Sequence, residues 1–194
     1  MWKINTPGRH LYLTFDDGPV PGPTEFVLDL LNKEKVKATF FCIGHNIERN
    51  PAIFQRILTE GHGVGNHTYD HVDGWKMSTS DYAGEVSRCA TLLHASGHKH
   101  RSLFRPPYGK ITRGKINSMK DYTIVMWDVM TYDFDHRVTP EQCLTGALKA
   151  VRPGSIVVFH DSVKAGRNMM FALPRFLDGC RQLGYDFQLL EAAS

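Results

Sequence analysis

The sequence predicts an α/β protein with a parallel sheet and crossover helices. Short apolar or β-branched runs alternate with segments of helical apolar spacing along all 194 residues. Polar side chains recur at or just after the ends of these runs, where parallel α/β folds place their chemistry. No linker, repeat or low-complexity segment interrupts the alternation, so we expect one domain over residues 1–194. Both an open doubly wound sheet and a closed barrel fit this pattern.

The first predicted strand, residues 11–15, ends in two adjacent carboxylates. Asp16 and Asp17 are followed by Gly18 and Pro19, which cannot continue a strand. A buried strand therefore delivers two acids to its carboxyl end, although Asp and Gly are also common in ordinary turns. No Gly-rich nucleotide loop follows, so a dinucleotide site is not expected.

The remaining elements are predicted from the same two patterns, short apolar runs for strands and helical apolar spacing for helices. Apolar runs predict strands at residues 37–43, 61–67, 103–104, 123–127, 155–159 and 186–190. Apolar residues at helical spacing predict helices at residues 25–31, from Asn50 onward, and at 80–95, 113–119, 139–151 and 173–183. Asn50 is expected to cap its helix, Thr139 begins a capping box, and Pro174 is expected near the start of the last helix.

Composition excludes several classes of function. The net charge of +3 is too small to indicate nucleic-acid binding, and no apolar segment approaches the length of a membrane span. The segment MWKINTPGRH lacks an apolar signal core, so we expect a cytoplasmic protein or an exported one whose leader has been removed. We expect a monomer. Cys42, Cys89, Cys143 and Cys180 lack metal-type spacing and are interpreted as buried free thiols.

Two histidines at a spacing of four follow the third predicted strand. His67 and His71 can face one cation from a helical turn or a tight loop, or they can belong to a solvated surface turn. A carboxylate from Asp16 or Asp17 would complete a set typical of zinc or a similar divalent ion. A second histidine group, His94, His98 and His100, has no carboxylate nearby and is interpreted as solvated.

Three further polar residues lie near predicted strand ends. Arg105 precedes two prolines, a stiff segment that would hold its guanidinium still. Asp133 follows the fifth strand, and His160 ends the apolar run SIVVF. Each could be an ordinary surface or core residue, but in a barrel all of them would converge on one mouth.

The motifs TFDDGP, HTYDH, RPPYG, WDVMTYDF and VVFHD, in this order, resemble those of the NodB-type polysaccharide deacetylases, carbohydrate esterase family 4 (CE4). The resemblance implies a distorted, incomplete (β/α)7 barrel of the TIM-like type and one divalent metal ion. It further implies removal of N-acetyl groups from amino sugars, or of O-acetyl groups from xylan.

The resemblance also implies a role for each matching residue. Asp17, His67 and His71 match the metal ligands. Asp16 matches the catalytic base, Arg105 the arginine that orients it, His160 the catalytic acid and Asp133 its partner. The backbone N–H of Tyr108 would help to bind the oxyanion, and Phe134 and Val158 would line a pocket for the acetyl methyl group.

The chain departs from the family at three positions. The family usually has aspartate, tryptophan and leucine where this chain has Met130, Phe134 and Val158. These differences concern the substrate and the rate more than the metal site.

We therefore expect a hydrolase that deacetylates peptidoglycan, a chitin-like oligomer or a related glycan, using zinc, with cobalt or nickel able to substitute. One alternative is a hydrolase of another small amide or a cyclic imide on the same fold. A second is a non-catalytic glycan-binding domain that retains the metal.

Overall fold

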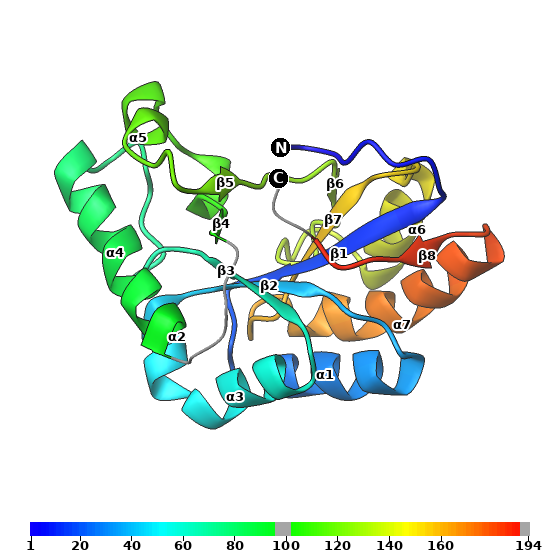
Figure 1. Ribbon diagram of the computed structural model, residues 1–194. Coiled ribbons are helices and arrows are strands. Elements are labelled where there is room, and N and C mark those ends of the chain that lie inside the picture. The colour runs from blue at the N-terminus through cyan, green and yellow to red at the C-terminus, as the bar shows by residue number, and fades with distance from the viewer. Residues whose placement is uncertain (96–101, 191–194) are drawn as a thin grey trace.

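A computed structural model describes residues 1–95 and 102–190 as a curled sheet surrounded by helices (Figure 1). Its strands are β1 (His10–Asp16), β2 (Thr39–Cys42), β3 (Gly63–Asn66), β4 (Leu103–Phe104), β5 (Thr123–Ile124), β6 (Val129–Met130), β7 (Ile156–His160) and β8 (Asp186–Phe187). The order is β5-β4-β3-β2-β1-β7-β6, and every strand pairing is parallel. β8 pairs with the first residues of β1.

This strand order is that of a barrel opened at one seam. Neighbours in the sheet are consecutive in the chain except at β1 and β7, where an early strand and a late strand pair, and no pairing within the described ranges joins β5 to β6. Met1 lies at this seam, where its amino group donates to the Ile124 carbonyl and its own carbonyl accepts from Met126. The sheet is therefore an incomplete, distorted barrel, which confirms the predicted fold.

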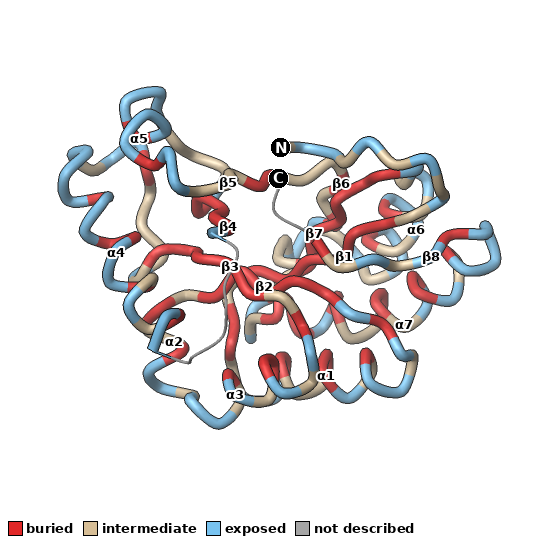
Figure 2. The backbone as a smooth tube through the Cα atoms, in the orientation of Figure 1, coloured by how far each residue is buried: buried red, intermediate tan, exposed pale blue. Residues whose placement is uncertain are grey.

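Helices cover the outer face of the sheet. They are α1 (Pro23–Glu34), α2 (Gly44–Arg49), α3 (Pro51–Thr59), α4 (Thr79–Ala95), α5 (Arg113–Asn117), α6 (Pro140–Ala150), α7 (Gly166–Gln182) and the 3₁₀ turn η1 (Pro107–Gly109). Figure 2 shows the central strands buried, while the helices are buried mainly on the side that faces the sheet. The parallel strands and the crossover helices are as the sequence predicts.

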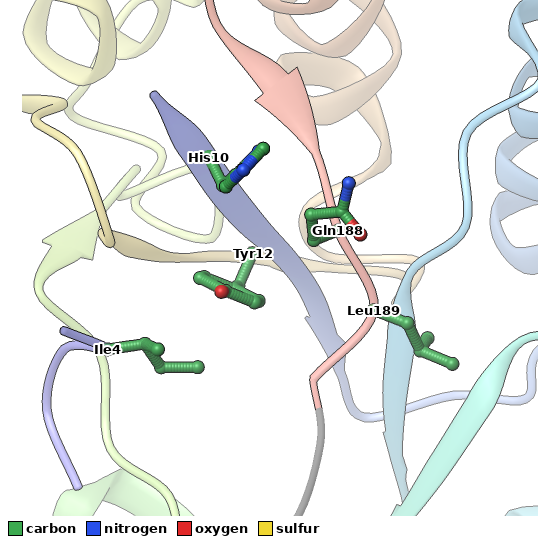
Figure 3. Close-up of a pocket in the computed structure, with 5 residues that line it drawn as sticks. All are labelled: Ile4, His10, Tyr12, Gln188 and Leu189. Carbon is green, nitrogen blue, oxygen red and sulfur yellow. The ribbon is translucent and has the colours of Figure 1, made fainter. Parts of the chain in front are cut away.

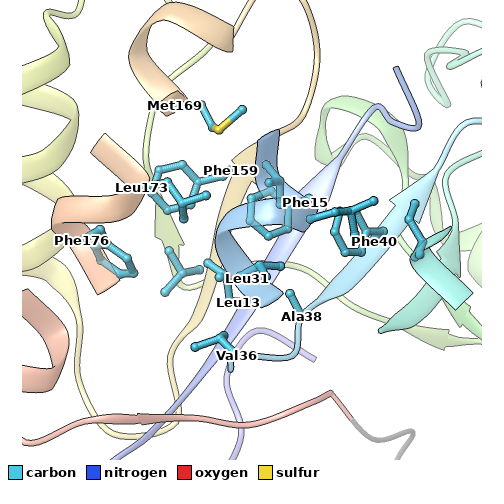
Figure 4. Packing of buried hydrophobic residues seen from close by; sticks show 14 of the residues in the cluster. Leu13, Phe15, Leu31, Val36, Ala38, Phe40, Phe159, Met169, Leu173 and Phe176 are labelled. Atoms are coloured by element: carbon cyan, nitrogen blue, oxygen red, sulfur yellow. The ribbon is translucent and has the colours of Figure 1, made fainter. Parts of the chain in front are cut away.

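Alternation along β1 separates the core from the interior of the barrel. Leu11, Leu13 and Phe15 face outward into the main hydrophobic cluster beneath the helices, and Figure 4 shows Phe15 packed among Phe40 and Phe159. The intervening residues, which end with Asp16, therefore point to the barrel interior, because successive side chains of a strand face opposite sides. Asp17 follows at the turn.

The last helix begins earlier than the sequence analysis predicts. α7 starts at Gly166, and Pro174 lies inside it rather than near its start. Proline removes one backbone hydrogen bond from the helix. Met169 and Leu173 precede Pro174, and both are completely buried in the same core cluster as Phe176. Burial of this continuous apolar face outweighs the missing bond.

Two other local predictions were wrong. The predicted strand at residues 123–127 ends at Ile124, and β6 follows as a separate two-residue strand that pairs with β7. Asn50 precedes α3, but its side chain donates to the carbonyls of Pro19 and Asn46 instead of capping the helix. It closes the end of α2, a helix that the sequence analysis missed.

Other predictions agree with the structure. All four cysteines are buried and free, and the Thr139 capping box is present at the start of α6. Across residues 1–95 and 102–190, no helix is both long and apolar enough to cross a membrane.

A cavity of about 440 Å³ lies at the end of β1 opposite to Asp16 (Figure 3). Its lining residues are Ile4, His10, Tyr12, Gln188 and Leu189. No carboxylate is among these lining residues, so they bring no paired acid and base groups to the cavity.

Candidate active site

The candidate site is a cavity of about 510 Å³ at the carboxyl ends of the strands. Its lining residues are Asp16, Asp17, His67, His71, Tyr108, Trp127, Met130, Phe134, His160 and Lys164. Most of the residues singled out in the sequence therefore meet here, although they come from five separate parts of the chain. Arg105 and Asp133 are fully buried and contact this lining from behind.

Asp17, His67 and His71 form a candidate metal centre. A carboxylate oxygen and one ring nitrogen from each histidine all lie within 4.8 Å of one another. Asp17 Oδ1 is 3.3 Å from His71 Nε2 and 3.9 Å from His67 Nε2. The backbone of Asp17 has a φ of 85°, so the chain turns sharply here and directs this carboxylate apart from that of Asp16.

Both imidazoles in this cluster are held neutral. Burial, together with the neighbouring His71, lowers the pKa of His67 to about 3. Burial also lowers the pKa of His71. The Arg105 carbonyl lies 2.7 Å from His67 Nδ1 and can only accept, so Nδ1–H donates and Nε2 keeps its lone pair. Neutral imidazoles with oriented lone pairs and a carboxylate suit a divalent cation.

Asp16 is anchored by a buried guanidinium. Arg105 Nη1 donates to Asp16 Oδ1 at 2.6 Å and also to the Thr14 hydroxyl. The other guanidinium nitrogens donate to the carbonyls of Val125 and Met126, so Arg105 is held from three sides. The second carboxylate oxygen, Asp16 Oδ2, lies 3.9 Å from His67 Nε2 and faces the cavity.

His160 lies next to Asp16 in the adjacent strand and has the opposite environment to His67. Asp133 accepts from the His160 ring Nδ1–H at 2.8 Å and from its backbone N–H at 2.7 Å. Burial alone would lower the pKa of His160, but the charge and hydrogen bond of Asp133 outweigh it and raise this pKa to about 9. His160 is therefore a cation at neutral pH.

The predicted substrate-contacting residues occupy different depths. Tyr108 is at the rim, with its ring 4.6 Å from the His71 ring and its backbone at a φ of 59°. Phe134 packs edge-on against the His160 ring at 4.9 Å and lines the cavity. Val158 is fully buried on the same face of β7 as His160, one pleat below it, and is not among the lining residues.

Sequence reasoning missed three residues of this region. Trp127 and Lys164 line the cavity. Asp161 lies beneath it, where its carboxylate accepts from the Gly18 N–H and the Thr24 hydroxyl. Burial raises the pKa of Asp161 to about 7. The available signal was its position directly after His160, at the end of an apolar run.

The second histidine group lies apart from the site. His94 is in α4, beside a cavity between α4 and α5 that contains none of the candidate site residues. His98 and His100 lie outside the described residues.

Comparison with known proteins identifies the family. A family model described as "Polysaccharide deacetylase" matches residues 3–127, which is more than half of the chain. This chain belongs to the polysaccharide deacetylase family. The resemblance found in the sequence motifs is thereby confirmed.

Relatives in the polysaccharide deacetylase family cover nearly the whole chain. A peptidoglycan-N-acetylglucosamine deacetylase of Bacillus cereus is 32% identical over 192 residues, which are 96% of this chain and 88% of the relative. A chitooligosaccharide deacetylase of Bradyrhizobium sp. is 34% identical over 81% of this chain and 73% of its own length. The solved structure of the peptidoglycan N-acetylglucosamine deacetylase Bc1960 aligns with a TM-score of 0.92 at 30% identity, covering 97% of this chain and 89% of that one.

Two further comparisons bear on function. The chain spans only 55% of another Bacillus cereus peptidoglycan-N-acetylglucosamine deacetylase, and 38% of the enzyme PgdA of Listeria monocytogenes. The CE4 family also includes a pseudoenzyme, BA3943 of Bacillus anthracis, which aligns with a TM-score of 0.86 at 25% identity over 96% of this chain and 66% of that one. Membership of the family therefore leaves activity to be argued from the residues of the site.

Proposed function

We propose that this protein is a metal-dependent deacetylase that hydrolyses N-acetyl groups of an amino-sugar glycan such as peptidoglycan or a chitin-like oligosaccharide. O-acetyl groups are a possible second substrate. The observation that carries the proposal is that two ion pairs, one anchoring a carboxylate and one anchoring a histidine, lie at the same cavity. Asp16 with Arg105 provides a carboxylate, and His160 with Asp133 provides an acid, beside the Asp17, His67 and His71 cluster.

The donor set fits one divalent ion. One carboxylate and two neutral imidazoles leave room for further ligands, and zinc is the ion we propose, with cobalt or nickel able to substitute. An ion held there would supply Lewis acidity toward the acetyl carbonyl and would lower the pKa of water.

Asp16 is the proposed base. Asp16 forms an ion pair with Arg105, and its carboxylate can accept the proton of the attacking water. The four hydrogen bonds of Arg105 keep the carboxylate from rotating, so its free oxygen stays directed at the cavity.

His160 is the proposed acid. An amine leaves an amide carbon readily only when it is protonated, and the protonated ring can donate that proton from Nε2. Asp133 holds Nδ1 and leaves Nε2 as the donor that faces the cavity.

The backbone N–H of Tyr108 is the proposed donor to the tetrahedral oxyanion. Phe134 forms an apolar side of the cavity that suits an acetyl methyl group, whereas Val158 is buried behind the lining. Met130 lies in the cavity wall where the family usually has a carboxylate, so among the described residues Asp133 is the carboxylate that accepts from the His160 ring.

A non-catalytic glycan-binding protein is the second candidate. It is favoured by the departures at Met130 and Phe134 and by the presence of a pseudoenzyme among the structural relatives. Against it, the base, its arginine, the acid and its aspartate all have their hydrogen-bonded partners here. Hydrolysis of another small amide or a cyclic imide would use the same groups.

The test is acetate release from a panel of N- and O-acetylated sugars, with cyclic imides included, in the presence of zinc, cobalt or nickel. We expect acetate from N-acetylated oligosaccharides. Hydrolysis of imides alone would move the proposal to the amide alternative. No turnover of any substrate, together with measurable glycan binding, would favour the binding protein.

A further inference from the structure

A large aromatic side chain is exposed beside the candidate site. Trp75, in the segment between β3 and α4, is 66% exposed, although indole is among the most apolar side chains. The segment follows His71, so it lies at the same end of the sheet as the site. Exposed aromatic surface of this kind often marks a place where a ligand binds.

The backbone beneath Trp75 is fixed by specific contacts. Asp73 accepts the Trp75 N–H at 2.9 Å through one carboxylate oxygen and the Lys110 ammonium at 2.8 Å through the other. At Gly74 an added Cβ would lie 2.2 Å from the Lys110 carbonyl oxygen, so the two backbones are in direct contact. A surface held in this way loses little conformational entropy when it binds a ligand.

Lys110 connects Trp75 to the rim of the cavity. Its ammonium lies 5.2 Å from the centre of the Trp75 ring and 5.5 Å from that of Tyr108. Tyr108 is itself 60% exposed, and its ring packs against His71. Two exposed rings with an ammonium between them therefore extend outward from the metal-side ligands.

We propose that Trp75, Lys110 and Tyr108 form a glycan subsite that binds the sugar ring adjacent to the one being deacetylated, an inference that rests on the proposed function. A pyranose has apolar C–H faces that pack on indole or phenol rings, and hydroxyl and acetamido oxygens that accept from an ammonium. Asp73 neutralises most of the charge of Lys110, so the subsite suits a neutral N-acetylated sugar better than an anionic group.

The test compares substrates with and without a second sugar. For Trp75→Ala, kcat/KM on N-acetylchitotetraose should fall about tenfold, mainly through KM, as expected when about 1.4 kcal/mol of stacking is lost. Activity on the N-acetylglucosamine monosaccharide should stay within about twofold, because the monosaccharide does not reach the subsite.

Two further variants serve as controls. Trp75→Phe should give an intermediate value. Leu183→Ala, which removes another exposed apolar side chain, should leave the activity on both substrates unchanged. Equal effects on both substrates, or none, would overturn the subsite.

A binding experiment separates this inference from the proposed function. Titration of N-acetylchitotetraose into the Asp16→Asn variant, followed by tryptophan fluorescence, needs no turnover. Adding Trp75→Phe should weaken binding and reduce the fluorescence change. Unchanged affinity would reject the subsite even in an active enzyme. Affinity that falls with Trp75→Phe would support it even if the wild type released no acetate.

Discussion

His67 and His160 are the same residue type at the ends of two strands of one sheet, yet their pKa values lie at opposite extremes. Burial and the neighbouring His71 lower the pKa of His67 to about 3. His160 is also buried, but its pKa is raised to about 9. The main difference is the group at Nδ1, which is a neutral carbonyl of Arg105 for His67 and the carboxylate of Asp133 for His160.

This contrast divides the cavity into two halves with different chemistry. The neutral ring of His67 offers a lone pair and can hold a cation, whereas the charged ring of His160 offers a proton. Asp16, the proposed base, is paired with Arg105 and lies between them. The partner at one ring atom thus gives each histidine a different protonation state, and variants can test the two halves separately.

The largest effect is expected on the metal half. His67→Ala combined with His71→Ala should remove the bound metal and all activity, because two of three donors are lost. Metal content of the purified protein is the direct measurement. His45→Ala is a matched control, since His45 is half-exposed and paired with Asp70 outside the cluster. Undiminished metal in the double variant would place the ligands elsewhere, with His94 and His98 the next to be tested.

The base should be separable from the metal. Asp16→Asn should lower kcat by about 10³-fold or more while metal content stays near that of the wild type, because a carboxamide cannot accept the proton of water. Kinetics and metal analysis on the same sample decide this. Loss of metal in this variant, with retention in Asp17→Asn, would mean that the roles of the two aspartates are exchanged.

The acid half should respond to pH. Asp133→Asn removes the charge that raises the pKa of His160, so that pKa should fall. Activity needs the protonated ring and declines above its pKa, so the alkaline limb of the pH–rate profile should move down by about 2 units. We expect kcat near pH 7 to fall about twofold through lost protonation, with a larger loss at higher pH, and His160→Ala to remove the limb. A profile for Asp133→Asn that overlays the wild type would exclude this pairing.

The smallest effect concerns the contact between Gly18 and the buried carboxylate of Asp161. At Gly18 an added Cβ would lie 2.0 Å from Asp161 Oδ2, so Gly18→Ala should cost about 1–3 kcal/mol of stability and weaken metal binding through the shifted Asp17. Gly84→Ala in α4 meets open space and should be neutral or stabilising by up to about 1 kcal/mol. Urea midpoints compare the two variants, and equal midpoints would contradict the role of Asp161.

The sequence predicted the location of the site best where polar residues directly follow a buried strand. Asp16 and Asp17 follow a buried strand, and their position at its end could be predicted from the run LYLTF alone. The meeting of His67, Arg105 and His160 at one cavity could be expected from the alternation of strands and helices. Their individual roles came from the family resemblance and not from spacing.

Features that depend on tertiary contacts were harder to predict. Pro174 appeared to begin a helix, because nothing local shows that Met169 and Leu173 are buried together before it. The two-residue β6 exists through its pairing with β7, which no local pattern reveals. The buried position of Asp161 depends on Gly18 and Thr24, which are distant in the sequence and contact it only in the folded chain.

The register of β1 and β7 has a consequence for how such a protein can evolve. Asp16 and His160 are direct partners across these two strands, so one inserted or deleted residue in either strand would turn one of them to the outer face. Such a change would inactivate the site even if the barrel still formed. A matching insertion in the other strand would restore the pairing but leave both side chains on the outer face, so neither strand should change length by a single residue before these positions.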